Sequence, residues 1–242
     1  MAGHSHWAGI KHRKAAQDKK RGRAFGKFSK AIMIAAREAG PDPDMNLKLR
    51  YAIDKARAGN MTNDAIDRAI KKATGELGDI VFEDVLYEGY GPGGVAIMAE
   101  VLTDNRNRTA PEMRKLFSSA GGNLGNPGSV SFMFDRKGLI SIAAEGKDFD
   151  EVFEVAADAG AENCEQQEDI IGITTGPTEF AAVRNALVAK GWELSTAEVA
   201  WVPQTPATPP AEVTAKVEDL LSKLDDHEDV QNVYSNYEPA ES

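Results

Sequence analysis

The chain has 242 residues, of which 42% are hydrophobic and 27% are charged, a composition typical of folded globular proteins. No run of the sequence approaches the roughly 18 apolar residues of a membrane-spanning helix, and the first residues lack the apolar segment of a secretory signal. We therefore expect no membrane partner. The single cysteine, Cys164, excludes an internal disulfide and any zinc site that needs two thiolates. These properties favour a cytoplasmic protein.

The net charge of −10 is the sum of two opposite parts of the chain. Residues 1–75 contain 17 Lys and Arg against 7 Asp and Glu, a charge of +10, whereas residues 76–242 contain 11 against 31, a charge of −20. A uniformly acidic protein would be repelled by phosphate, but a concentrated cationic segment attracts a polyanion. The charge pattern therefore indicates that the first part of the chain binds nucleic acid.

The first part of the chain reads as a basic arm followed by helices. Residues 1–23 have few apolar side chains, so we expect a flexible arm that does not fold alone. Apolar residues then recur at steps of three and four in three segments, each followed by a glycine. The predicted helices run from about residue 23 to Gly40-Pro41, over 46–58 and over 63–74. Together they predict a helical domain over residues 24–78.

After residue 78 the apolar period changes to that of strands. The sequence predicts strands at 80–88 and 95–102, joined by the turn GYGPGG. A helix at 109–119 follows, for which Thr109 and Glu112 match a capping box, and then a strand at 130–135.

The next part of the chain predicts a second α/β unit. Its elements are a strand at 138–143, a helix at 148–159, strands at 163–168 and 170–175, a helix at 177–190 and a strand at 193–202. This βαββαβ order is that of a ferredoxin-like fold. The proline-rich segment 203–210 is read as a stiff spacer, followed by a helix at 211–225 and a strand at 229–237.

The last helix and strand have no sheet of their own, and the first α/β unit lacks a closing helix and strand. Because an unpaired sheet edge is a liability, we expect residues 206–242 to join 79–135 in one α/β domain, with 136–205 inserted. The expected fold class is α+β: an N-terminal three-helix domain followed by two ferredoxin-like α/β domains, the second inserted in the first.

The basic arm and the first helix carry the main candidate site. Cations on phosphates release counterions and bind with strong salt dependence, and an aromatic or imidazole ring can stack on unpaired bases. The candidate nucleic-acid contacts here are Trp7, Lys11, His12, Arg13, Lys14, Lys19, Lys20, Arg21, Arg23, Lys27 and Lys30. The alternatives are a solvated charge run and a site for an acidic protein partner.

Two further groups of cations are candidate phosphate contacts. Arg68, Lys71 and Lys72 on the third helix suit phosphates better than base edges, so no base-reading recognition helix is evident. Arg106 and Arg108 lie at a strand-to-helix junction, where backbone N–H groups also favour anions. The alternative for this pair is a capped surface helix with local charge pairing.

No pattern in the sequence predicts catalysis. His4 and His6 lack the further ligands that a metal site needs, and His227 reads as a surface residue among acids. The turn GYGPGG lacks the spacing of nucleotide-binding loops and fits a hairpin. We expect no enzyme activity, metal, cofactor or small-molecule substrate, and the sequence carries no signal for an oligomeric state.

Six motifs in order resemble those of the YebC family over essentially the whole chain. They are GHSHWAGIKHRKAAQDKKRGRAFGKFSKAI, NDAIDRAIKKATG, YEGYGPGGVA, TDNRNRT, GGNLGNPGSVSFMF and DVQNVYSNYE. The resemblance implies three domains, the return of 211–237 to the second domain, and nucleic-acid binding without a cofactor. Members of the family are described as DNA-binding transcriptional regulators and as factors that act in translation. The implied function is a DNA-binding transcriptional regulator, with a ribosome-associated factor that binds ribosomal RNA as the alternative.

Overall fold

The structure is a computed structural model that describes residues 21–74, 82–167 and 169–239. The described residues divide into two compact units. One unit is Ser131–Pro206, and the other contains the helices and strands that precede and follow it in the sequence. Residues 1–20, and with them the predicted contacts from Trp7 to Lys20, lie outside the described residues.

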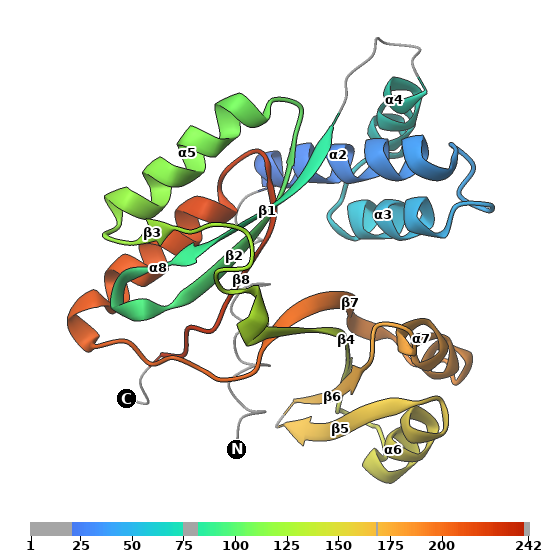
Figure 1. Ribbon diagram of the computed structural model, residues 1–242. Helices are drawn as coiled ribbons and strands as arrows, with labels where there is room; N and C mark the ends of the chain where they lie inside the picture. Colours follow the sequence, from blue (N-terminus) through green and yellow to red (C-terminus); the bar gives the residue numbers. More distant parts are fainter. Residues whose placement is uncertain (1–20, 75–81, 168, 240–242) are drawn as a thin grey trace. The chain divides into compact units, whose positions relative to one another are not determined.

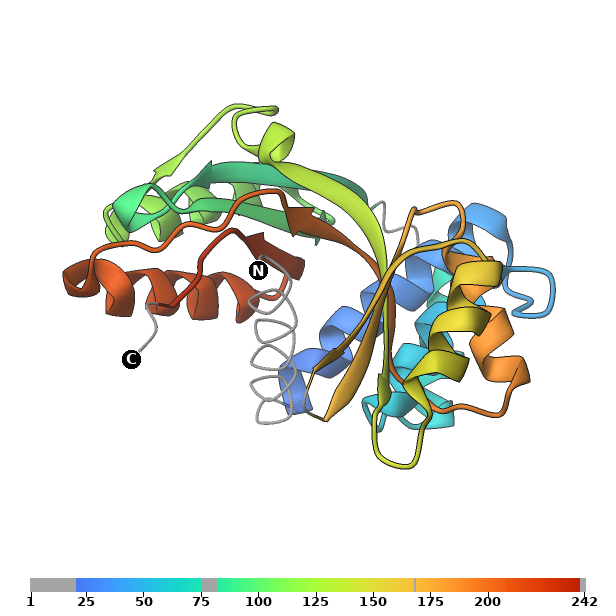
Figure 2. The ribbon, with the colours of Figure 1, turned by 90° about the horizontal axis from the view of Figure 1, so that it is seen from below.

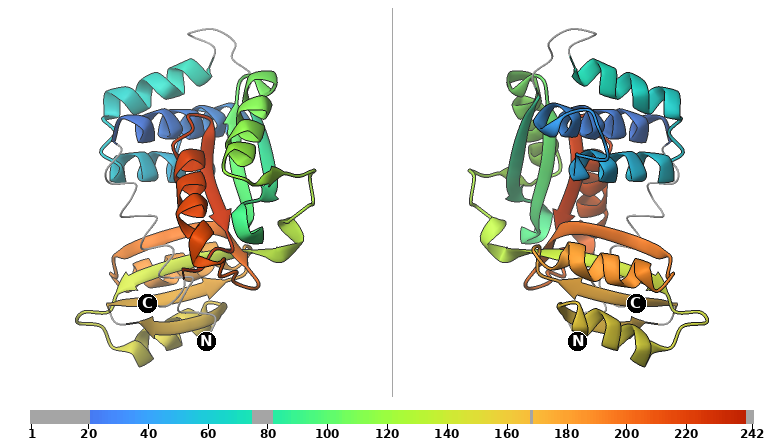
Figure 3. Two further views of the ribbon diagram at one scale, coloured as in Figure 1. Left: turned by 90° about the vertical axis from the view of Figure 1, so that its left-hand side faces the viewer. Right: turned by 90° about the vertical axis from the view of Figure 1, so that its right-hand side faces the viewer.

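Three helices form a bundle at the start of the described chain: α2 (Arg21–Ala39), α3 (Leu47–Ala58) and α4 (Asn63–Ala73). Both α3 and α4 pack against α2 (Figure 3). The Asn46 side chain caps α3 by accepting from Leu49 N at 3.0 Å, and its amide group donates to the carbonyl of Ala35 at 2.7 Å. A buried polar side chain with satisfied hydrogen bonds thus connects the end of α2 to the start of α3.

Four strands and two helices form the first α/β domain. They are β1 (Glu83–Tyr90), β2 (Ala96–Thr103), α5 (Arg106–Ser119), β3 (Asn123–Leu124), α8 (Ala211–Asp225) and β8 (Val230–Ser235). The sheet is antiparallel in the order β3-β1-β2-β8. The register places Ile97 opposite Ser235, so the last strand of the chain covers the second edge of β2.

One face of this sheet is covered by α5 and α8, which lie side by side (Figures 1 and 3). Strand residues of even and odd number point to opposite faces, and those that point to the helices join one apolar cluster. Its largest fully buried members are Phe117, Met113 and Ile97. This packing fixes α5 over β1, which positions the cations discussed below.

The unit Ser131–Pro206 contains the second sheet. Its elements are η2 (Ser131–Met133), β4 (Phe134–Ala143), α6 (Phe149–Asp158), β5 (Ala161–Gln167), β6 (Ile170–Thr175), α7 (Phe180–Ala189) and β7 (Leu194–Pro203). The strand order β5-β6-β4-β7 is antiparallel throughout, which is the ferredoxin-like arrangement. Both helices lie on one face of the sheet, over Ile140, Ile142, Ile171 and Ile173 (Figure 2).

The expected fold class, three N-terminal helices followed by two α/β sheet domains, is confirmed. Two local predictions are wrong. The α5 helix begins at Arg106, and its cap is Asn105, whose side chain accepts from Arg108 N at 3.1 Å, so Thr109 and Glu112 form no capping box. The predicted strands at 130–135 and 138–143 are parts of β4 and its 3₁₀ lead-in, and the strand expected in the first sheet is the two-residue β3.

Candidate nucleic-acid interface

The predicted phosphate contacts of the first helix divide into two groups. Arg21 and Arg23 lie in the first turn of α2. Lys27 and Lys30 lie further along the same helix, and the structure describes their side chains. Only the second pair can therefore be placed relative to its neighbours.

Both described lysines of α2 bind the acidic connection between α8 and β8. The Lys27 ammonium donates to the carbonyl of Asp225 at 2.6 Å, at the carboxyl end of α8 where a cation is favoured by the helix dipole. The Lys30 ammonium donates to the carbonyl of Glu228 at 3.2 Å and forms an ion pair with Asp229. Two cations predicted to meet phosphate are thus engaged by the chain itself.

Asp229 is the centre of this network, and its side chain is 0% exposed. One carboxylate oxygen accepts from Lys30. The other accepts from the Arg108 guanidinium and from the Thr109 hydroxyl, both at 2.8 Å. The Thr109 hydroxyl also lies 2.8 Å from that of Thr103. The carboxylate therefore connects the helical bundle to the start of α5, and the pairing of the second predicted arginine, Arg108, is tertiary rather than only local.

The charge of Asp229 is stabilised by its partners. Burial alone would raise its pKa, but the hydrogen bonds from Lys30, Arg108 and Thr109 lower the pKa to about 2. The same contact raises the pKa of Arg108 above its ordinary value. Burial lowers the pKa of Lys27, and the neighbouring Asp225 opposes that change. The Asp229 carboxylate and the Arg108 guanidinium are thus both charged at neutral pH.

We expect Asp229 to make stability depend on pH between about 4 and 2. Its pKa is about 2 in the folded chain against 3.8 for the ordinary group, so its contribution is complete above pH 4 and is lost as the pH falls through 2. The expected loss is about 2.5 kcal/mol, since each unit of pKa corresponds to about 1.4 kcal/mol. Urea unfolding at several pH values should show a shallower decline for Asp229→Asn than for the unchanged chain. Parallel declines over this window would contradict the assignment.

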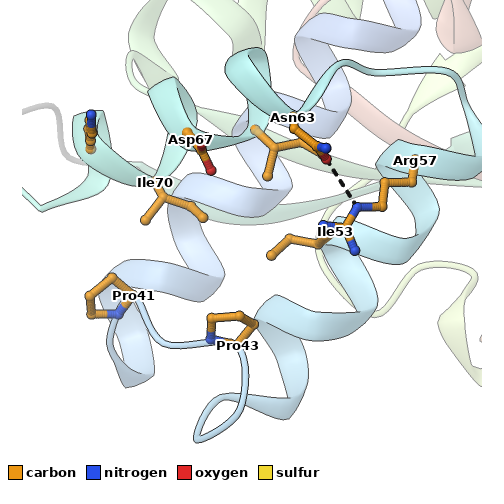
Figure 4. A pocket seen from close by; sticks show the side chains of 9 residues that line it. Pro41, Pro43, Ile53, Arg57, Asn63, Asp67 and Ile70 are labelled. Atoms are coloured by element: carbon orange, nitrogen blue, oxygen red, sulfur yellow. Dashed lines mark hydrogen bonds between the residues drawn. The ribbon is translucent and has the colours of Figure 1, made fainter.

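The predicted contacts of α4 lie on a surface of mixed charge. Arg68 donates to the carbonyl of Asp64 at 3.1 Å. The exposed face of the helix carries acids in its first half, Asp64 and Asp67, and bases in its second half, Arg68 and Lys71. Lys71 lines a hollow of about 510 Å³ between α3, α4 and the α2–α3 connection, with Pro41, Pro43 and Ile53 on its walls (Figure 4). Lys72 is half-buried. This face lacks the uniform positive charge of a phosphate-binding helix.

Arg106 differs from Arg108 although only one residue separates them. Arg106 is exposed at the first position of α5, and it forms no ion pair within the described residues. Arg114, two turns further along, is exposed and unpaired among the same residues. Of the two predicted arginines, Arg108 is therefore bound to the buried Asp229, and Arg106 has no acidic partner among the described residues.

His227 corrects a further prediction. Its side chain is 13% exposed and its Nε2 lies 3.0 Å from a carboxylate oxygen of Glu112, while its Nδ1 accepts from the backbone N–H of Asp229. It belongs to the α8–β8 connection rather than to the open surface. The residues that sequence reasoning missed are Asp225, Asp229 and Thr109. The acidic run DDHED at 225–229 was the available signal, because a basic helix elsewhere in the chain offers it a partner.

Other kinds of site find no support in the described part of the chain. No group of three His, Cys, Asp or Glu side chains gathers there as metal ligands would. No helix among these residues is both long and apolar enough to cross a bilayer. Burial raises the pKa of the half-buried Cys164 to about 11, so its thiol is a poor nucleophile at neutral pH.

Comparison with known proteins shows which protein families and relatives the chain is similar to. Residues 5–76 match the family described as "TACO1/YebC protein N-terminal domain", and residues 82–237 match "TACO1/YebC second and third domain". A protein of Treponema denticola is 52% identical over 98% of this chain and 96% of its own length, and one of Shewanella oneidensis is 51% identical over the same shares. Both are named "Probable transcriptional regulatory protein".

A solved structure shares the fold as well. The crystal structure of a conserved hypothetical protein of Aquifex aeolicus superposes with a TM-score of 0.85 at 44% identity, covering 98% of each chain. The two family matches together span most of the sequence, and the relatives are similar over nearly its full length. Both comparisons indicate the same family. The chain belongs to the TACO1/YebC family.

Proposed function

We propose that the chain is a non-enzymatic, cytoplasmic regulator of gene expression that binds DNA through its basic N-terminal segment. The observation that carries this proposal is the segregation of charge: residues 1–23 contain seven Lys and Arg against one Asp, in a chain whose net charge is −10. Several cations on neighbouring phosphates release condensed counterions, which gives strong, salt-sensitive attachment. The names of the relatives from Treponema denticola and Shewanella oneidensis support a regulatory role.

The contacts of Lys27 and Lys30 with acidic residues reduce the set of candidate phosphate contacts. Because both ammonium groups are bound to the α8–β8 connection, the phosphate contacts are assigned to Lys11, Arg13, Lys14, Lys19, Lys20, Arg21 and Arg23. Trp7 and His12 are assigned to stacking on bases.

A second candidate is a translation factor that binds ribosomal RNA. It is favoured by the mixed charge on α4, whose exposed face carries two acids followed by two bases. A helix that reads bases in the major groove lies between two phosphate backbones, so its exposed face should not repel phosphate. The exposed face of α4 carries Asp64 and Asp67, which would repel it. A basic arm that follows folded RNA needs no such helix.

The two candidates are distinguished by crosslinking the full chain in cells and sequencing the bound nucleic acid. Promoter duplexes are expected for the first and ribosomal RNA for the second. A full-length variant with Lys19, Lys20 and Arg21 replaced by alanine serves as the matched control and should lose most of the crosslinks. If the unchanged chain recovered neither DNA nor RNA above that control, the proposal would be overturned in favour of a protein partner.

A further inference from the structure

Tyr87 carries a hydroxyl that the fold leaves without a partner. The residue is in β1, 9% exposed, and its ring packs in the apolar cluster between the first sheet and α5. Its hydroxyl oxygen is buried and has no hydrogen-bond partner within residues 21–74, 82–167 and 169–239. A buried polar group of this kind costs about 1–3 kcal/mol, so its persistence calls for an explanation.

Two arginines of α5 lie close to this hydroxyl. Burial raises the pKa of the Tyr87 phenol, and the guanidinium groups of Arg106 and Arg114 act in the opposite direction, with Arg106 the stronger. Arg106 is beside the hydroxyl without forming a hydrogen bond of regular geometry with it. The phenol stays protonated at neutral pH and is therefore able to donate.

The charges of these two arginines are not neutralised by the described part of the chain. Arg108, on the same helix, is bound by Asp229 at 2.8 Å and by Asp104 at 3.3 Å. Arg106 and Arg114 form no such pair, and both are exposed. The nearby Asp229 is already shared by Lys30 and Arg108. Two guanidinium groups without an acidic partner among the described residues thus act on one unpaired donor, in a domain that is otherwise acidic.

We propose that Tyr87, Arg106 and Arg114 form an oxyanion site that takes a phosphodiester group of the bound nucleic acid. Each guanidinium offers paired N–H donors that match phosphate oxygens, and the phenol supplies a further donor. Arg106 is the first residue of α5, where the helix dipole also favours an anion. Because the hydroxyl is not exposed in the unbound chain, binding requires the side chains that cover it to move.

This inference rests on the proposed function, since it makes the site a second contact for the ligand of the basic arm. It also accounts for the difference between neighbouring arginines: Arg108 is fixed by the fold, and Arg106 and Arg114 remain available. The site lies in the same compact unit as α2, the helix that begins with Arg21 and Arg23.

The test compares four full-length variants: Tyr87→Phe, Arg106→Gln, Arg114→Gln and the control Lys216→Gln. Lys216 is an exposed cation of α8, so its replacement removes one surface charge and leaves Tyr87, Arg106 and Arg114 unchanged. Affinity for a duplex DNA and for a ribosomal RNA fragment is measured by fluorescence anisotropy at low salt. We expect losses of about tenfold for each arginine variant and about fivefold for Tyr87→Phe, against less than about twofold for the control.

Two readouts separate a binding role from a structural one. Because the hydroxyl has no partner, Tyr87→Phe should unfold at the same temperature as the unchanged chain or higher. Inorganic phosphate should shift the NMR signal of the labelled Tyr87 ring carbon that bears the hydroxyl, and this shift should be absent in Arg106→Gln. A clear loss of thermal stability in Tyr87→Phe would overturn the inference, since it would reveal a structural partner for the hydroxyl.

The outcomes also separate this site from the proposed function. If the chain bound nucleic acid but the three site variants matched Lys216→Gln, the oxyanion site would be wrong and the proposed function would stand. If the chain bound neither DNA nor RNA, the proposed function and the assignment of the site to a phosphodiester would both fail, whatever the response to inorganic phosphate.

Discussion

Replacing Asp229 with alanine is expected to lower the free energy of unfolding by about 3–5 kcal/mol. The change leaves Lys30, whose side chain is 18% exposed, and Arg108 without their common carboxylate, and it leaves the Thr109 hydroxyl with one acceptor fewer. Breaking a buried ion pair by removing one partner is costly when the remaining charge stays desolvated. This applies to Lys30, whereas the Arg108 side chain is 40% exposed and is partly hydrated without Asp229. Urea unfolding of the full-length chain measures the effect.

Asp219→Ala is the matched control. Asp219 and Lys223 form an ion pair of 2.6 Å on the surface of α8, with both side chains more than half exposed. Such pairs contribute about 0–1 kcal/mol. If the two alanine variants lost similar free energy, Asp229 would be no more than a surface partner. A double-mutant cycle of Lys30→Ala and Asp229→Ala then gives the coupling free energy between Lys30 in the helical bundle and Asp229 in the sheet domain.

Replacing Lys19, Lys20 and Arg21 with alanine should flatten the dependence of log K on log salt by about two to three units for duplex DNA. Each phosphate contact contributes a slope of about −0.9, so three contacts account for this change. The measurement is a series of binding isotherms for the full-length chain between low and moderate salt.

The structure provides an internal comparison for that experiment. Lys27 and Lys30 carry the same charge on the next turns of α2, but both are bound to the α8–β8 connection. Replacing these two with alanine should leave the slope nearly unchanged and reduce stability. A change of slope equal to that of the first variant would mean that nucleic acid displaces the acidic residues from the lysines.

The elements that the sequence predicted best are those whose signals agree with one another. The helix at 211–225 has the predicted bounds, since Pro210 precedes it and Val217, Leu220 and Leu224 recur at steps of three and four. Where two signals competed, the prediction failed. Asn105 and Thr109 are both good caps, and the sequence alone does not show that the Thr109 hydroxyl is taken by Asp229, far along the chain.

Strand β4 runs unbroken across residues 136–137, where the sequence predicted a gap between two strands. Gly138, the first residue of the second predicted strand, lies inside β4. A Cβ atom at this position would lie 2.2 Å from the Thr175 hydroxyl and 2.7 Å from the Phe180 ring. The glycine is needed for the close approach of β6 and α7, not for a turn.

The sequence could predict that the chain has a cationic site, but not which of its cations are available to a ligand. Charge counts along the chain identify the cationic segment, because charge is a property of the sequence. Which cations remain available depends on partners brought together by the fold, as Lys30 and Asp229 show. The Tyr87 hydroxyl carried no signal at all, since an unpaired donor is recognised only from its surroundings.

The pairing of β2 with β8 has a consequence for how the protein is made. A nascent chain synthesised only as far as Pro206 has β2 with an open edge, and its Lys27, Lys30 and Arg108 have not yet met Asp225 and Asp229. A product truncated at that point, by a premature stop or by cleavage in the proline-rich segment, would combine an aggregation-prone strand with two lysines that lack their acidic partners. Arg108 would keep only Asp104. Synthesis of α8 and β8 supplies the partners of both the open strand edge and the lysines.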